Sequence, residues 1–147
     1  LEVELKQRLE DIRENIFDNY RPIDETFDLI LSFRDFQSVK FIEEASSLKF
    51  PYYYFLALND FEKCKVEDFS IVNNFLSNST AGRLEQLELK ADLNQKLDVG
   101  QVMQGVEAAI KNTNEEVHLE GFKINDRQFI AILQASLHSN SLKLMNC

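Results

Sequence analysis

Residues 116–147 read EVHLEGFKINDRQFIAILQASLHSNSLKLMNC, and this stretch decides the fold class. Its pattern predicts a short strand, a turn, a helix and a second strand, in that order. Residues 55–89 follow the same plan, with the segments FLALNDF, DFSIVNNFL and LEQLEL in the corresponding places. Such repetition predicts a stacked solenoid, in which each unit buries its apolar side only against its neighbours. We therefore expect an α/β protein in which strands and helices alternate and the sheet is mainly parallel.

The rest of the C-terminal two thirds fits the same alternation. Asp98 is a suitable N-cap for a helix, and Asn125 with Gln128 three positions later has the pattern of a capping box. Strands are expected at residues 52–58, 84–90, 116–121 and 141–146, and helices at about 67–77, at about 98–111 and from Asn125 onward.

Equivalent leucines of these strands recur at similar intervals along the chain. They are Leu58, Leu89, Leu119 and Leu144, and the last interval is the shortest. The intervals are roughly 25–31 residues, whereas leucine-rich repeats with one helix per unit occupy roughly 20–29 residues. The units of this chain are therefore close to that range and slightly long.

The two best-formed units carry a specific pattern of apolar residues. It reads Val117-x-Leu119-x-x-Phe122-x-Ile124, then Phe129, Ile132 and Leu133, then Leu142-x-Leu144-x-x-Cys147. This pattern resembles leucine-rich repeats of the ribonuclease-inhibitor type, and the Phe-rich units look like divergent leucine-rich-repeat proteins of ciliates. The resemblance covers residues 52–147, and it implies that the Cys147 side chain hydrogen-bonds the turning backbone. The unit that begins with the strand at residues 84–90 departs from this pattern. The family places Asn or Cys after such a strand, whereas this chain has Ala91 or Asp92 at that position.

Residues 1–50 are expected to form an N-terminal helical cap on the solenoid of residues 51–147, itself expected to be part of a longer chain. Over residues 1–19 an apolar stripe with helical spacing is formed by Leu5, Leu9, Ile12 and Ile16. The stripe favours a helix that covers the open side of the solenoid. A coiled-coil seam, through which the chain would oligomerise, is the alternative.

The segment after this helix is harder to assign. Arg21-Pro22 ends the helix, because the residue before proline avoids the helical region. A second helix is predicted from Pro22 or Asp24, with the apolar positions Phe27, Ile30, Leu31 and Phe33. Residues 38–50 fit either a strand or a continuing helix, and the sequence leaves that choice open.

Composition limits the classes of partner. The 147 residues carry a formal net charge of −9 without a dense run of Lys or Arg, so we expect no nucleic acid and no anionic membrane as partner. No apolar run approaches the roughly 18 residues that a membrane-spanning helix needs, which predicts no membrane span. The two cysteines, Cys64 and Cys147, are too few for a disulfide framework. Their scarcity fits a reducing compartment, and we expect an intracellular, cytoplasmic protein.

The alternation of strand residues predicts which side chains are exposed. Successive residues of a strand point to opposite faces, and the inward set is expected to be Leu56, Leu58, Leu87, Leu89, Val117, Leu119, Leu142 and Leu144. On the other face, the residues expected to bind a partner are Gln86, Glu88, Lys90, His118, Glu120, Lys143 and Met145. The alternative for each of them is solvation of a short sheet, because most polar residues on such a face contribute little to binding energy.

Sequence motifs for catalysis are lacking. His118 and His138 belong to different predicted elements, and no Ser or Cys is arranged around either of them as a nucleophile. His118 and Glu120 are only two ligands, too few for a metal site. A calcium loop starting at Asp92 fails, because Leu97 stands where glycine is needed. We therefore expect no enzyme activity, no cofactor and no metal.

The sequence thus favours a non-catalytic scaffold that binds a protein partner through the strand face of the solenoid. The alternative is a structural subunit of a large multiprotein assembly, in which neighbours bury the open ends of the solenoid. The identity of the partner and the oligomeric state are left open by the sequence.

Overall fold

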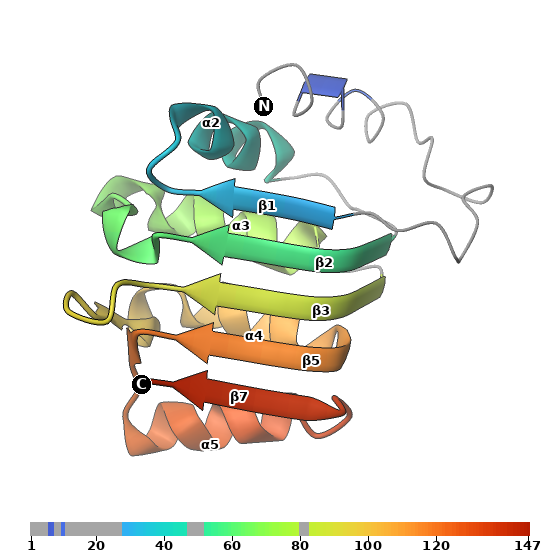
Figure 1. The fold of residues 1–147 in the computed structure, drawn as a ribbon, viewed down its shortest axis with the longest axis vertical. Helices are drawn as coiled ribbons and strands as arrows, with labels where there is room; N and C mark the ends of the chain where they lie inside the picture. The colour runs from blue at the N-terminus through green and yellow to red at the C-terminus, as the bar shows by residue number, and fades with distance from the viewer. Residues whose placement is uncertain (1–5, 8–9, 11–27, 47–51, 80–82) are drawn as a thin grey trace.

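Five parallel strands form the main sheet of the protein. The computed structural model describes residues 6–7, 10, 28–46, 52–79 and 83–147. Within these residues the strand order is β1-β2-β3-β5-β7, and every adjacent pair is parallel. The strands are β1 (Asp28–Ser32), β2 (Tyr52–Asn59), β3 (Arg83–Lys90), β5 (Thr113–Glu120) and β7 (Ser141–Met145). Each strand therefore lies beside the next long strand of the sequence, and the chain moves across the sheet in one direction (Figure 1).

Helices connect these strands on one side of the sheet. The helices are α2 (Phe36–Ala45), α3 (Phe69–Ser79), α4 (Met103–Lys111) and α5 (Asp126–Ala135). Figure 1 shows α3 and α4 behind the strands, and consecutive helices pack against one another from α2 to α5. The short strands β4 (Leu97–Asp98) and β6 (Phe122–Lys123) pair as a separate two-stranded sheet. The connection from β2 to α3 contains two 3-10 turns, η1 (Phe61–Lys63) and η2 (Val66–Asp68), and a third, η3 (Val99–Gln101), lies between β4 and α4.

Two rows of leucines in register form the inner face of the sheet. The first row is Leu29, Leu56, Leu87, Val117 and Leu142, and the second is Leu31, Leu58, Leu89, Leu119 and Leu144. All are buried except Leu142 and Leu144 on the edge strand, which are partly buried against the same core. The predicted inward set is therefore confirmed. Burying one such leucine side chain contributes about 1.5–3 kcal/mol, so these rows are a large part of the stability.

An aromatic column lies beyond the C-terminal ends of the strands. The Phe61 ring lies 4.7 Å from that of Phe33 and 5.4 Å from that of Phe122, measured between centroids. Phe61 and Phe122 are fully buried. The three phenylalanines follow β1, β2 and β5, so the column connects the turns that leave three different strands. This packing fixes the backbone of the turns that carry the polar residues at this edge of the sheet.

The N-terminal part of the described chain corrects one prediction. Residues 28–32 form strand β1, not part of the second helix predicted from Pro22 or Asp24. Leu29 and Leu31 are buried beside Leu56 and Leu58, whereas Ile30 between them is exposed. This two-residue alternation, together with pairing to β2, outweighs the helical spacing that suggested otherwise. The preceding residues 22–27 lie outside the described residues.

Residues 36–45, which the sequence left open in large part, are helical. Asp35 caps α2 by accepting a hydrogen bond from the backbone N–H of Gln37 at 3.0 Å. The predicted capping box of α5 is confirmed, since Asn125 and Gln128 each bond the backbone N–H of the other. The helix predicted over residues 1–19 lies mostly outside the described residues. Within that range the structure describes residues 6, 7 and 10, and all three are helical.

Candidate functional site

The face of the sheet opposite the inward leucines carries the residues proposed from sequence as contacts. One row across this face is formed in register by Ile30, Ala57, Glu88, His118 and Lys143. Gln86 lies beside Glu116 in a second row, and a third row contains Lys90, Glu120 and Met145. All seven candidates therefore lie on one face, over the three adjacent strands β3, β5 and β7. Lys143 and Met145 on the edge strand are the exposed members, and the other five are partly buried.

Ion pairs connect most of the charged residues on this face. His118 Nε2 lies 3.4 Å from Glu120 Oε1, and His118 Nδ1 lies 3.9 Å from Glu88 Oε1. The same Glu88 oxygen lies 3.1 Å from Lys90 Nζ. Farther along the face, Lys143 Nζ lies 3.3 Å from Glu116 Oε1. The side chains thus hold one another in place and present both signs of charge over a short distance. Such a surface can be complementary to a polar partner of mixed charge.

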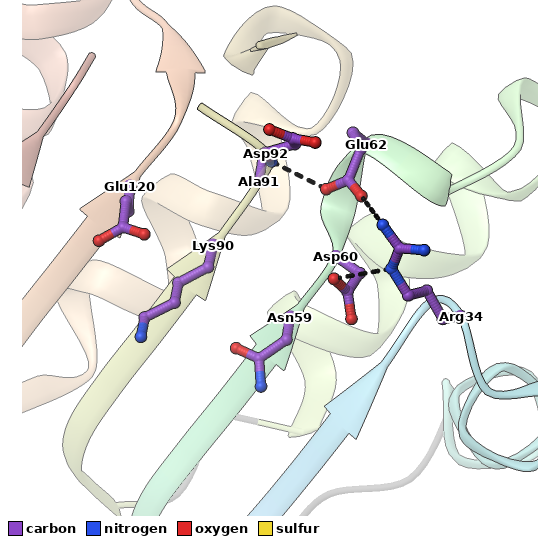
Figure 2. A pocket seen from close by; sticks show the side chains of 8 residues that line it. All are labelled: Arg34, Asn59, Asp60, Glu62, Lys90, Ala91, Asp92 and Glu120. Carbon is purple, nitrogen blue, oxygen red and sulfur yellow. Dashed lines mark hydrogen bonds and ion pairs between the residues drawn. The ribbon is translucent and has the colours of Figure 1, made fainter. Parts of the chain in front are cut away.

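A pocket lies at the edge of this face, where the strands end (Figure 2). Its volume is about 410 Å³. Four carboxylates line it (Asp60, Glu62, Asp92 and Glu120), together with the cations Arg34 and Lys90 and the neutral residues Asn59 and Ala91. These residues come from the ends of β2, β3 and β5 or from the turns that follow β1, β2 and β3. The pocket therefore lies outside the carboxyl ends of three neighbouring strands.

Glu62 holds the walls of this pocket together. Its side chain is 3% exposed, and its Oε2 lies 3.4 Å from Arg34 Nη2. Its other oxygen, Oε1, accepts a hydrogen bond of 2.8 Å from the backbone N–H of Asp92. Figure 2 shows Glu62 between these two partners, which follow β1 and β3. One carboxylate therefore fixes the relative positions of three turns.

Asp60 begins the turn after β2 in an unusual backbone conformation. Its φ of 59° lies in the left-handed region, which Asp and Asn tolerate better than most other residues. The Ser32 hydroxyl donates to Oδ2 of Asp60, and Arg34 Nε donates to Oδ1 at 3.1 Å. The bond from Ser32 lowers the pKa of Asp60 below its ordinary value; partial burial opposes this, and Arg34 adds to it. Asp60 is therefore ionised at neutral pH.

Sequence reasoning did not find this pocket. Arg34 follows a segment that was predicted to be helical, so it was not recognised as a residue at a strand end. Asp60 and Glu62 follow a predicted strand directly, and this position was the signal that could have pointed to them. The sequence places Asp92 either at the start of a failed calcium loop or, with Ala91, at the position where the repeat family has Asn or Cys, and neither interpretation points to a pocket. Asp92 Oδ1 instead accepts a hydrogen bond of 2.8 Å from the backbone N–H of Asn94.

The chemistry of the site is that of hydrogen bonds and ion pairs. His118 Nε2 hydrogen-bonds Glu120 Oε1 at 3.4 Å, and its Nδ1 lies 3.9 Å from Glu88, so the ring lies between two carboxylates. Within the described residues, no group of three or more His, Cys, Asp or Glu side chains could hold a metal ion.

The buried thiol of Cys64 has a pKa raised to about 12, chiefly by burial and further by the charges of Asp68 and Glu67. That thiol is thus poorly suited to act as a nucleophile.

The fold and this site define an α/β protein with a parallel sheet, one face of which is polar and has no covering layer among the described residues. Comparisons with protein-family models, with curated proteins and with solved structures give no match to this chain. No helix among the described residues is long and apolar enough to cross a membrane.

Proposed function

We propose that this chain is a non-catalytic protein-interaction module that binds a partner through the open face of its sheet. One observation carries the proposal. The connecting helices lie along the opposite side, so the face that carries Glu88, His118 and Lys143 has no covering layer among the described residues (Figure 1). Side chains on a rigid sheet lose little conformational freedom when a partner binds, which favours affinity.

The finer architecture is part of the same proposal. We infer that the units stack as a short leucine-rich-repeat-like solenoid, because successive strands are neighbours and equivalent leucines recur at similar intervals. A contact at the last turn supports this inference. The thiol of Cys147 lies 3.5 Å from the backbone oxygen of Met145 and 3.6 Å from that of Leu119, so it can donate to the turning backbone in the way that the resemblance implies.

Site-specific photo-crosslinking tests the proposed binding face. A photoreactive amino acid replaces His118 on the open face or, as the matched control, Gln104 on the exposed side of α4. In extract of the source cells, a specific protein should be crosslinked from position 118 and not from position 104. Equal crosslinking from both positions, or none from position 118, would refute the proposal.

Charge reversal then tests the residues themselves. With the crosslinked partner purified, the double variant Glu120→Lys/Lys143→Glu should weaken binding by about tenfold, because favourable pairs at the face become repulsive. Its melting temperature should remain that of the parent chain, because both side chains lie outside the core. An unchanged Kd would remove the open face from consideration.

A specific observation favours a second candidate function, a structural subunit of an assembly. The apolar side chains of α5 and the following turn are exposed, with Ile130 at 54% and Leu137 at 82%. Beside them, the outer edge of β7 has no strand partner among the described residues. Exposed apolar residues next to an open strand edge favour association with another subunit.

Light scattering on the purified chain separates the two candidates. A subunit should self-associate when isolated, and Ile130→Glu with Leu133→Glu should reduce that association. Val66→Glu is the matched control, because Val66 is also exposed but lies in η2, away from this end of the sheet. A parent chain that is monomeric at all concentrations would contradict the subunit function.

A further inference from the structure

The pocket at the strand ends has a charge that its own cations do not neutralise. Four carboxylates and two cationic side chains line it. Arg34 is engaged with Asp60 and Glu62, and Lys90 is engaged with Glu88, at distances between 3.1 and 3.4 Å. Asp92 and Glu120 therefore keep acceptor capacity toward the pocket, since each carboxylate offers about four lone-pair positions. The excess charge favours a cationic group over an anionic one.

A second observation at this pocket is independent of charge. The side-chain oxygen Oδ1 of Asn59 is buried and has no hydrogen-bond partner among the described residues. An unsatisfied buried acceptor is costly, so it is rarely retained without a reason. Figure 2 shows the Asn59 amide at the end of β2, between Lys90 and Asp60. A ligand that brings N–H donors into the pocket would satisfy this oxygen.

The kind of cation follows from the geometry of the donors. The described residues contain no cluster of carboxylates and imidazoles suited to a metal ion. The acceptors come instead from separate strand ends and turns around a volume of about 410 Å³, which lies within the roughly 300–1,000 Å³ of ligand pockets. A guanidinium or ammonium group carries several N–H donors at the end of a long side chain, and can reach separated acceptors.

We propose that this pocket binds a basic side chain, arginine or lysine, of the protein partner. The inference rests on the proposed function, because it assigns the chemistry of the partner at the margin of the same open face. The Asp92 and Glu120 carboxylates supply charge and acceptors, and Asp60 adds negative charge beside Arg34. Asn59 supplies a neutral acceptor, and Glu62 keeps the turns in position. The bound side chain would enter from the open face, where Glu120 belongs to both the face and the pocket.

Titration with matched small probes, followed by NMR, tests the pocket without the partner. N-acetyl-argininamide is the cationic probe, N-acetyl-lysinamide is the ammonium probe, and N-acetyl-citrullinamide is a neutral molecule of nearly the same shape. A cationic probe should give saturable shifts of the Asn59 side-chain amide and of the Asp92 and Gly121 backbone amides. Citrullinamide should bind at least about tenfold more weakly, because it lacks the charge.

A paired variant shows whether the pocket carboxylates are responsible. Asp60→Asn/Asp92→Asn removes two charges but keeps the left-handed turn at position 60 and the acceptor for Asn94, so the fold should be retained. It should weaken probe binding by about tenfold, whereas the control Glu107→Gln on α4 should leave it unchanged. Equal binding of the citrulline probe, no saturable shift, or full binding by the variant would overturn the inference. Saturable shifts with Ca²⁺ and none with the cationic probes would likewise overturn it.

The partner experiment distinguishes failure of the inference from failure of the proposed function. Position 60 and position 92 are outside the seven candidate residues of the open face. If crosslinking from position 118 succeeds but Asp60→Asn/Asp92→Asn binds the partner with the parent affinity, the binding face stands and the basic side chain is refuted. If the cationic probe binds and no partner is crosslinked, the face proposal falls, and with it the assignment of the pocket to a protein partner.

Discussion

Gly121 and Ala91 approach so closely that a side chain at position 121 has no room. Gly121 has a φ of +78°, and a Cβ built on it would lie 2.3 Å from the carbonyl oxygen of Ala91. The backbone N–H of Ala91 meanwhile donates to the Glu120 carbonyl at 2.8 Å. The turns after β3 and β5 are therefore packed backbone to backbone, directly beside the pocket.

Gly121→Ala should destabilise the protein by at least about 1–2 kcal/mol. An L-residue with a Cβ pays a steric cost of this size in the left-handed region, and the collision with the Ala91 backbone adds to it. Urea denaturation measures the change. Gly100→Ala is the matched control, because a Cβ there would meet only the side chains of Gln128 and Asp98. Equal destabilisation by both substitutions would contradict this account.

Leu119→Ala should lower the free energy of unfolding by about 2–5 kcal/mol. Leu119 is fully buried between β3 and β7, and truncation leaves a cavity that its rigid neighbours fill only in part. Thermal and urea denaturation measure the loss. The matched control is Leu137→Ala, at an exposed position, which should change stability by less than about 0.5 kcal/mol. A small effect at Leu119 would show that the inner face of the sheet is not the core.

Ser32→Ala should raise the pKa of Asp60 toward 3.8, the ordinary value for its carboxyl group. The Ser32 hydroxyl is the largest cause of the lowered pKa, because its hydrogen bond favours the ionised form. Carbon-detected NMR titration of the Asp60 carboxyl group measures the shift. The same pKa in both proteins would exclude the hydroxyl as the cause.

Asp60 should make the stability of the protein depend on pH only in acid. A carboxylate whose pKa is lower in the folded state stabilises the fold above its unfolded pKa, and this contribution is lost as the pH falls through the folded pKa. Asp60→Asn should therefore reduce the loss of stability below about pH 4, and leave the pH dependence from about 6 to 8 unchanged. Denaturation series at fixed pH values measure both. A variant that loses stability in acid as steeply as the parent would contradict the prediction.

The two thiols should react at very different rates. Cys64 is buried with a pKa raised to about 12, whereas Cys147 is exposed. A maleimide at neutral pH should modify Cys147 in the folded protein, and Cys64 only after unfolding, because the thiolate is the reactive form. Peptide mapping by mass spectrometry identifies the modified residue. In Cys147→Ser, rapid labelling of the folded protein would show that Cys64 is accessible after all.

The strands were predictable where alternation was long and clear. Paired leucines two positions apart, such as Leu87 with Leu89, determine which face is inward, and three strands were predicted with ends close to those observed. Strand β1 was missed because it is short, and its apolar positions also fit a helix. Its pairing with β2 makes this segment a strand and not a helix, and no local sequence pattern contains that information.

The candidate site was predictable only in part, for a related reason. The open face follows from the same alternation that identifies the core, so His118 and Lys143 could be assigned to it. The pocket instead gathers residues far apart in sequence: Arg34 and Glu62 are 28 residues apart, and Glu62 and Asp92 are 30 apart. They meet only when parallel strands bring their ends together, and that depends on strand order and register.

The order of the strands has a consequence for how the protein forms during synthesis. Because each new strand lies beside the one made before it, a growing chain on the ribosome can add β3 to β2 and then β5 to β3 without waiting for any later segment. Of these strands β7 emerges last, and it is held by a single neighbour among the described residues. For the proposed solenoid, shortening the chain from its C-terminus should remove strand–helix units in turn, and the remainder should stay folded only while about three units are left.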